Sequence, residues 1–146
     1  MIPEFDGGGL LPPGIHKVSW SEIVERFGGT GWRRRLLTGL RTAVDSLKHA
    51  GCETIYVDGS FVTRKEIPGD FDACWEVGGV DPTILDPVLL TFDPGRATQK
   101  AKYMGELFPA SIIADEDGFS FLEFFQIDKE TGQQKGIVAI DLRELR

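Results

Sequence analysis

The sequence has few of the residues that build disulfide frameworks or zinc sites. Its 146 residues include two cysteines and two histidines. Cys52 and Cys74 are too far apart for a paired ligand motif, and neither histidine stands at ligand spacing. These counts exclude a disulfide-stapled secreted domain and a four-ligand zinc centre. We therefore interpret His16 and His49 as structural residues.

The sequence also lacks a long apolar run and an excess of positive charge. No segment approaches the roughly 20 apolar residues that span a membrane, and no signal-peptide pattern opens the chain. We therefore expect a cytoplasmic protein with no membrane partner. The net charge of −7 argues against a protein that wraps nucleic acid over its whole surface. It leaves room for a local basic surface and for metal ions that offset the acidic charge.

Length and composition predict one domain covering residues 1–146. A chain of this length can bury a substantial core, and it contains no internal repeat or low-complexity segment. Residues 1–18 hold three consecutive glycines and two consecutive prolines, which predict an extended arm packed on the domain. Residues 19–50 are predicted to be helical, and residues 51–146 contain the sheet-forming segments.

Two helices are predicted from their capping residues. The segment Ser19–Glu22 fits a capping box for a short helix that ends at Gly28. Thr30 can cap a longer helix that runs to about Ala50, with apolar residues at spacings of three and four. The cations Arg33–Arg35 in its first turn oppose the helix dipole. We favour ion pairs with the protein's own acidic side chains, and an acidic partner or a nucleic-acid phosphate is the alternative.

The remaining elements alternate between strands and helices, which predicts an α+β (α/β) fold with a mixed sheet and helices packed on it. Residues 119–128 suit a buried helix and a strand equally. The predicted strands are Thr54–Asp58, Asp70–Val77, Ala110–Ala114 and Gly136–Leu142, and the predicted helices are residues 83–90 and Arg96–Leu107.

Two acids stand one residue apart in the second of these strands. Asp70 and Asp72 should project from the same face of the sheet, because side chains alternate along a strand. Two unpaired carboxylates there would repel each other. A magnesium ion between them would remove the repulsion, since Mg²⁺ binds through one or two carboxylates together with water and substrate phosphates. Solvated acids at a strand end are the alternative reading.

A glycine-serine pair follows the preceding strand. Gly59 allows close approach of the backbone to a ligand, and the exposed amide groups after it can hold an anion. The hydroxyl of Ser60 adds a donor for a phosphate oxygen. Lys65, between this turn and the acids, could attract a triphosphate, or belong to an ordinary solvated surface.

This arrangement resembles the signature of the nucleotidyltransferase superfamily related to DNA polymerase beta. The matching residues are Gly59-Ser60, a gap of nine residues, and Asp70-Phe71-Asp72-Ala73. More narrowly, the chain resembles a bacterial family of short nucleotidyltransferase-like proteins. The segments that carry this narrower resemblance are residues 1–16, 51–72, 121–126 and 137–142.

The resemblance implies a minimal nucleotidyltransferase fold. It also implies a magnesium-dependent reaction, in which a nucleoside monophosphate passes from a nucleoside triphosphate to a hydroxyl group of a protein or RNA acceptor. Gly59 and Ser60, with Lys65 beside them, would bind the triphosphate. Asp70 and Asp72 would bind Mg²⁺, with room for a second ion.

The sequence departs from the superfamily pattern at two places. Asp58 precedes the glycine where an apolar residue is usual, and no third carboxylate is evident on a later strand. We take Asp141 as the third catalytic carboxylate and keep Glu123 and Asp115 as weaker alternatives. If none of them reaches the site, the metal site is incomplete.

A second hypothesis is a catalytically inactive domain that binds a cognate partner protein. Small members of the superfamily often occur in toxin–antitoxin or defence pairs, so this reading also follows from the resemblance. So short a chain has little room for an acceptor-binding domain of its own. The acceptor could therefore be recruited by a second protein or across an oligomer interface. A third carboxylate facing Asp70 and Asp72 would favour the enzyme.

Overall fold

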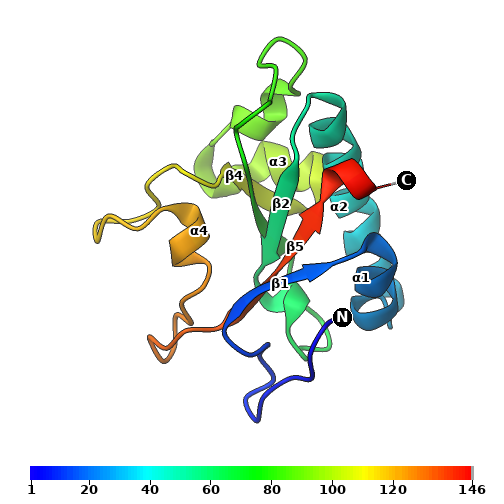
Figure 1. Ribbon diagram of the computed structural model, residues 1–146, viewed down its shortest axis with the longest axis vertical. Coiled ribbons are helices and arrows are strands. Elements are labelled where there is room, and N and C mark those ends of the chain that lie inside the picture. The colour runs from blue at the N-terminus through cyan, green and yellow to red at the C-terminus, as the bar shows by residue number, and fades with distance from the viewer. Residues whose placement is uncertain (146) are drawn as a thin grey trace.

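The computed structural model describes residues 1–145 and shows a mixed five-stranded sheet with helices on both sides (Figure 1). The strands lie in the order β1-β5-β2-β3-β4. Pairing is parallel between β1 and β5 and between β3 and β4, and antiparallel elsewhere. The strand bounds are β1 Gly14–Val18, β2 Thr54–Asp58, β3 Phe71–Trp75, β4 Gly105–Pro109 and β5 Gly136–Asp141.

Three helices cover one face of the sheet and enclose the main core. Leucines along one side of α2, such as Leu36 and Leu40, pack with the alternate strand residues Val57 and Ala73. These side chains are at most 1% exposed, so this half of the molecule is a closed apolar layer. The helices of this layer are α1 Trp20–Phe27, α2 Gly31–His49 and α3 Ala97–Tyr103.

The opposite face is covered by a single segment of mixed structure. Residues 110–135 leave the sheet after β4, form the short helix α4 Phe121–Phe124 and return to begin β5 (Figure 1). Phe125 and Ile137 lie at the centre of a smaller apolar cluster beneath this segment. The cover is incomplete, so polar groups on this face of the sheet remain accessible.

The structure confirms the α+β class, the mixed sheet and both predicted helix starts. Glu22 N donates to Ser19 Oγ at 3.2 Å, while Ser19 N donates to Glu22 Oε1 at 3.1 Å, which completes the capping box. Strands β2 and β3 are antiparallel neighbours, and a 3₁₀ helix at Ser60–Val62 follows the glycine between them. Among the described residues, no helix is long and apolar enough to cross a membrane.

Three boundary predictions were wrong. The predicted arm contributes the edge strand β1, because Gly14–Val18 pairs with β5. The helix predicted over Arg96–Leu107 ends at Tyr103, since Met104 adopts a left-handed conformation (φ 65°) and Gly105 begins β4. Residues 110–114 therefore lie beyond that strand, with one isolated bridge between Ile113 and Ser120 in place of a strand.

Helical structure near residues 83–90 is confined to a 3₁₀ helix at Pro87–Leu90. Two further 3₁₀ helices lie at Pro94–Arg96 and Leu142–Glu144. The segment that suited both a helix and a strand contains α4, whose first turn is capped by Ser120.

Candidate functional site

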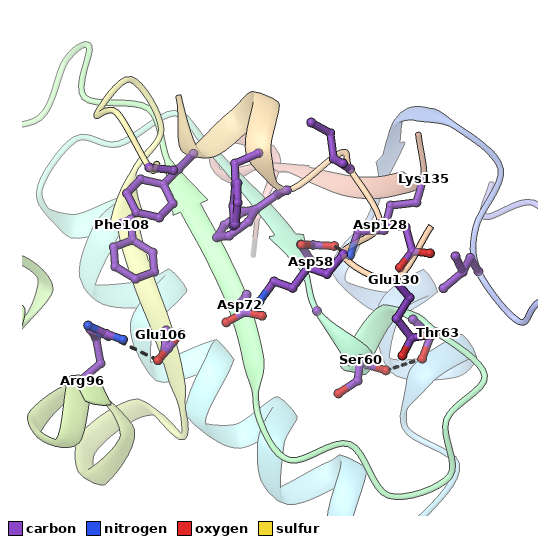
Figure 2. A pocket seen from close by; sticks show the side chains of 18 residues that line it. Asp58, Ser60, Thr63, Asp72, Arg96, Glu106, Phe108, Asp128, Glu130 and Lys135 are labelled. Atoms are coloured by element: carbon purple, nitrogen blue, oxygen red, sulfur yellow. Dashed lines mark hydrogen bonds and ion pairs between the residues drawn. The ribbon is translucent and has the colours of Figure 1, made fainter. Parts of the chain in front are cut away.

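Three carboxylates lie side by side on the partly covered face of the sheet. Asp58 pairs with Asp72 across β2 and β3, and Asp72 pairs with Glu106 across β3 and β4. Their strand neighbours point into the helical core, so all three side chains project to the other face. Directly opposed residues on adjacent strands have Cβ atoms about 4.5–5.5 Å apart. Figure 2 shows Asp72 between the other two.

Asp70 lies just before β3 and joins this group through a shared lysine. Lys100 Nζ from α3 is 3.7 Å from Asp70 Oδ2 and 3.4 Å from Glu106 Oε1. Arg96 Nε lies 3.3 Å from the same Glu106 oxygen. Asp70 is therefore next to the row and lines a separate hollow with Lys100. Lys100 in α3 and Arg96 just before it partly neutralise Asp70 and Glu106.

A buried ion pair closes the other end of the row. Lys135 Nζ, at the end of the covering segment, lies 3.0 Å from Asp58 Oδ1, with side-chain exposures of 14% and 5%. Oδ1 makes no geometrically satisfactory hydrogen bond within residues 1–145, so the lysine charge is its main compensation. The pair ties the covering segment to β2 beside the glycine-serine turn.

The glycine-serine turn requires its glycine. Gly59 has φ 84° and ψ −175°, a conformation that is essentially restricted to glycine. A Cβ at this position would lie 2.7 Å from Asp72 Oδ2. The turn therefore presses against the central carboxylate, and Ser60 and Thr63 line the space in front of it. Thr63 Oγ1 donates to Ser60 O at 2.7 Å, which fixes the short 3₁₀ helix (Figure 2).

Arg33 supports this turn from behind. The side chain is buried, and its guanidinium donates to the carbonyl oxygens of Phe27, Phe61, Thr63 and Lys65 at 3.3, 2.7, 2.9 and 2.5 Å. The favoured expectation of ion pairs is wrong for Arg33, because its donors all go to backbone carbonyls. The first turn of α2 thus fixes the loop that carries the glycine-serine turn.

Electrostatics make Asp72 the least ordinary carboxyl of the site. Burial raises its pKa from 3.8 to about 7, with further contributions from the charges of Asp70, Asp58 and Glu106 and from a hydrogen bond with Glu106. Burial also raises the pKa of Asp58 and of Asp70, against the opposing effects of Lys135 and Lys100 respectively. A raised carboxyl pKa in a cavity is typical of functional sites.

The carboxylate row opens into a cavity of about 520 Å³ between the sheet and the covering segment. This volume lies within the range of small-molecule sites. One end is polar and holds the carboxylates, the glycine-serine turn and Lys135, and the other end is aromatic. Four phenylalanines line the aromatic end: Phe108, Phe121, Phe124 and Phe125.

Residues 3–141 match DUF6932, a family of unknown function. The chain belongs to this family. No curated protein and no solved structure matches it. The DUF6932 match includes every residue of the cavity described above, but it assigns none of them a role.

The third carboxylate of this DUF6932 chain is not the predicted one. Asp141 pairs with Thr54 at the far end of β2, four residues from Asp58, which is about 13 Å along a strand. Its carboxylate binds Arg143, with Nη2 and Oδ2 3.0 Å apart. The prediction that Asp141 points into the same cleft as Asp72 is therefore wrong, because the antiparallel register places it at the opposite edge.

The two weaker alternatives are also engaged elsewhere. Glu123 accepts from Ser120 N at 3.0 Å as part of the α4 capping box. Asp115 accepts from Asp117 N at 3.1 Å in a turn of the covering segment. Neither lines the cavity, and Lys65 is likewise exposed outside it. Lys135 takes the place beside the turn that we expected for Lys65.

Glu106 is the residue that sequence reasoning missed. Glu106 falls within the helix predicted over Arg96–Leu107, so it was not expected on a strand. Gly105, directly before Glu106, is a helix-stop signal. Asp58 was noticed only as a departure from the superfamily pattern. In the structure Asp58 and Glu106 flank Asp72. Asp58, which departs from the superfamily pattern, therefore belongs to the same carboxylate cluster as the motif residue Asp72.

The donor chemistry of the site suits Mg²⁺ bound jointly with a ligand. Asp72, with Glu106 and Asp70 near it, offers the one or two carboxylates that Mg²⁺ uses alongside water and phosphate oxygens. Among residues 1–145, no three Asp, Glu, His or Cys side chains form a group that could hold a metal ion by themselves. Phosphates would have to complete the coordination.

Proposed function

We propose that this DUF6932 protein binds a nucleoside triphosphate together with Mg²⁺ and transfers the nucleoside monophosphate to an acceptor hydroxyl. One observation carries the proposal: a buried carboxyl with raised pKa, Asp72, stands between Asp58 and Glu106 and touches a glycine-only turn. Such a cluster is unfavourable without a cation. The turn beside it exposes backbone donors suited to an anion.

In this proposal each part of the site has a separate task. The turn at Gly59 and Ser60, with Lys135 nearby, binds the phosphate chain. Asp72, Asp70 and Glu106 hold Mg²⁺, which offsets phosphate charge when it is bound. The acceptor oxygen forms a bond to the α-phosphorus, the bond from that phosphorus to the bridging oxygen breaks, and pyrophosphate leaves. The hydroxyl proton passes to solvent.

The test compares two aspartate-to-asparagine variants of equal chemistry. Asp72→Asn removes the central carboxylate, and Asp141→Asn removes one at the opposite edge of the sheet. We expect Mg²⁺ with nucleoside triphosphate to raise the melting temperature of the wild type and of Asp141→Asn, but not of Asp72→Asn. Labelling of acceptors in a cell extract by α-³²P nucleotides should follow the same order. Equal responses of all three proteins would refute the proposal.

A second function, binding of a partner protein without catalysis, is favoured by a different observation. Lys135, Lys100 and Arg96 already compensate the carboxylates, so the cluster is partly neutralised without a metal. Ile112, 44% exposed, and Ile113, 59% exposed, also leave apolar surface on the covering segment. A wild type that binds Mg²⁺-nucleotide without labelling any acceptor would favour this reading, as a regulated component of a toxin–antitoxin or defence pair.

A further inference from the structure

The aromatic end of the cavity has a geometry of its own. Phe108 and Phe121 are stacked with ring centroids 4.0 Å apart and planes 5° apart. Phe92 is also nearly parallel to Phe108, with ring centroids 5.7 Å apart and planes 18° apart. Phe125 packs at an angle to Phe121, with centroids 5.6 Å apart. The cavity therefore ends at an apolar group of aromatic rings, in which Phe108 and Phe121 form a parallel pair that we call the aromatic ladder.

Several of these rings are only partly covered by protein. Phe108, Phe121 and Phe124 are half-buried, whereas Phe125 beside them is 5% exposed. All of them line the cavity that contains Asp72. If these aromatic side chains served only to pack the covering segment on the sheet, we would expect them to be fully buried, as the side chains of the helical core are. The exposed ring surface can accept another flat apolar group.

The spacing between the two ends matches a molecule with a charged and a flat part. Phe108 is two residues after Glu106 on β4 and projects from the same face, so their Cα atoms are about 7 Å apart. Figure 2 shows Phe108 next to Glu106 along β4, with Asp72 next to Glu106 on the neighbouring strand. A sugar fits between a phosphate at the carboxylate row and a base at the rings.

Arg96 connects the two ends. Its Nε lies 3.3 Å from Glu106 Oε1, and its guanidinium carbon is 6.0 Å from the centroid of Phe108. Its backbone is left-handed (φ 53°, ψ 41°), a conformation that costs free energy for a non-glycine residue. Arginine both pairs with anions and stacks on flat rings. This placement adds a cation at the junction of the polar and aromatic ends.

We propose that the aromatic ladder of Phe108 and Phe121 is the base-binding subsite, so that the cavity selects nucleotides over other polyphosphates through stacking. This inference rests on the proposed binding of a triphosphate at the carboxylate row. Stacking of a base on aromatic side chains is worth about 1–3 kcal/mol and tolerates every base. The larger ring system of purines gives them the stronger contact.

The experiment separates the base from the phosphates. Dissociation constants are measured with Mg²⁺ for inorganic tripolyphosphate, ribose 5-triphosphate and the four nucleoside triphosphates. For the wild type we expect nucleoside triphosphates to bind about 5- to 150-fold more tightly than ribose 5-triphosphate, which is the stacking free energy expressed as a ratio. Purine nucleotides should bind more tightly than pyrimidine nucleotides.

Variants then assign this difference to the ladder. Phe121→Leu and Phe108→Leu should lose most of the preference for a base, while affinity for tripolyphosphate stays within twofold of wild type. Phe108→Tyr keeps the ring and should keep the preference. Phe119→Leu, in the covering segment but outside the cavity, is the matched control and should behave as wild type.

The outcomes distinguish this inference from the proposal beneath it. Equal affinity of the wild type for ribose 5-triphosphate and nucleoside triphosphates would overturn the base subsite while leaving the phosphate site standing. A base preference that is unchanged in both Phe121→Leu and Phe108→Leu would also overturn the base subsite and leave the phosphate site standing. Absence of tripolyphosphate binding to the wild type would remove the phosphate site, and the base subsite with it. If Phe108→Leu fails to fold, Phe121→Leu and Phe108→Tyr decide the question.

Discussion

The raised pKa of Asp72 predicts that the metal-free protein loses stability as pH rises. The folded state binds this proton more tightly than the unfolded state, whose carboxyl titrates near 3.8 against about 7 in the fold. The stabilisation from this proton is complete below about pH 4, where both states are protonated, and it is lost as the pH rises to about 7, because only the folded state keeps the proton in that interval. Stability should therefore be higher at pH 5 than at pH 8, the reverse of an aspartate in an ordinary ion pair.

The size of the effect follows from the same two values. A difference of about three pH units corresponds to about 4 kcal/mol, at 1.36 kcal/mol per unit. About two of these units, or roughly 3 kcal/mol, are lost between pH 5 and pH 8. For a domain of this length, that free energy corresponds to a melting-temperature difference on the order of 10 °C. Asp58 and Asp70 add to the decline, because burial raises the pKa of each. The other charged groups around this cluster include Glu106, Lys100, Lys135 and Arg96, and the cavity is also lined by Asp128, Lys129 and Glu130.

The assay is thermal and urea unfolding in EDTA at half-unit steps from pH 5 to 8. This range avoids pH values below 4, where aspartates with lowered pKa, such as Asp86 and Asp128, begin to lose their partners. Asp72→Asn should be more stable than wild type at pH 5 and by a larger margin at pH 8, with at most half the wild-type slope. Asp141→Asn should keep the full slope. An unchanged slope in Asp72→Asn would refute the reasoning about burial and repulsion at this site.

Three further predictions concern the support of the site. Arg33→Met should lower the free energy of unfolding by on the order of 3 kcal/mol, because it strands buried carbonyls, whereas exposed Arg34→Met should change it by less than about 0.5 kcal/mol in urea titrations. Gly59→Ala should lower the free energy of unfolding by roughly 1–3 kcal/mol, because the added Cβ would meet Asp72. It should also abolish Mg²⁺-triphosphate binding in calorimetry, and binding at wild-type affinity would contradict this prediction. Lys135→Met should lower the free energy of unfolding by about 3–5 kcal/mol at pH 8, because it leaves the Asp58 carboxylate buried without its cation. In a double-mutant cycle, adding Asp58→Asn should restore much of this stability. Additive effects of the two substitutions would argue against the ion pair.

The parts of the fold that local chemistry dictates could be predicted from the sequence. Ser19 and Thr30 start helices through their own side chains, and β2 and β3 are apolar segments joined by a short connection. Strand β4 could not be predicted, because Gly105–Pro109 is short and follows a helical pattern without a break other than the glycine. Its place beside β3 depends on tertiary pairing, which sequence periodicity does not report.

The site was predictable only where its residues are close in sequence. Gly59, Ser60, Asp70 and Asp72 lie within one connection, so their spacing was informative. Glu106 reaches the site from β4 and Lys135 from the end of the covering segment, and nothing in their local sequence indicates that they meet there. Asp141 failed for the same reason, since choosing it required the register of β5 against β2.

The charge balance of the cluster argues for a ligand over a purely structural role. Asp58, Asp70, Asp72 and Glu106 bring four acidic groups together, while Lys135, Lys100 and Arg96 supply three cations. Burial of Asp72 destabilises its charged form, and an apolar residue at that position would pack on the sheet without this cost. Residues that break a local rule of stability concentrate at functional sites. Under the proposed function, a divalent cation would place positive charge beside Asp72, and the phosphate chain bound with it would contact the turn at Gly59.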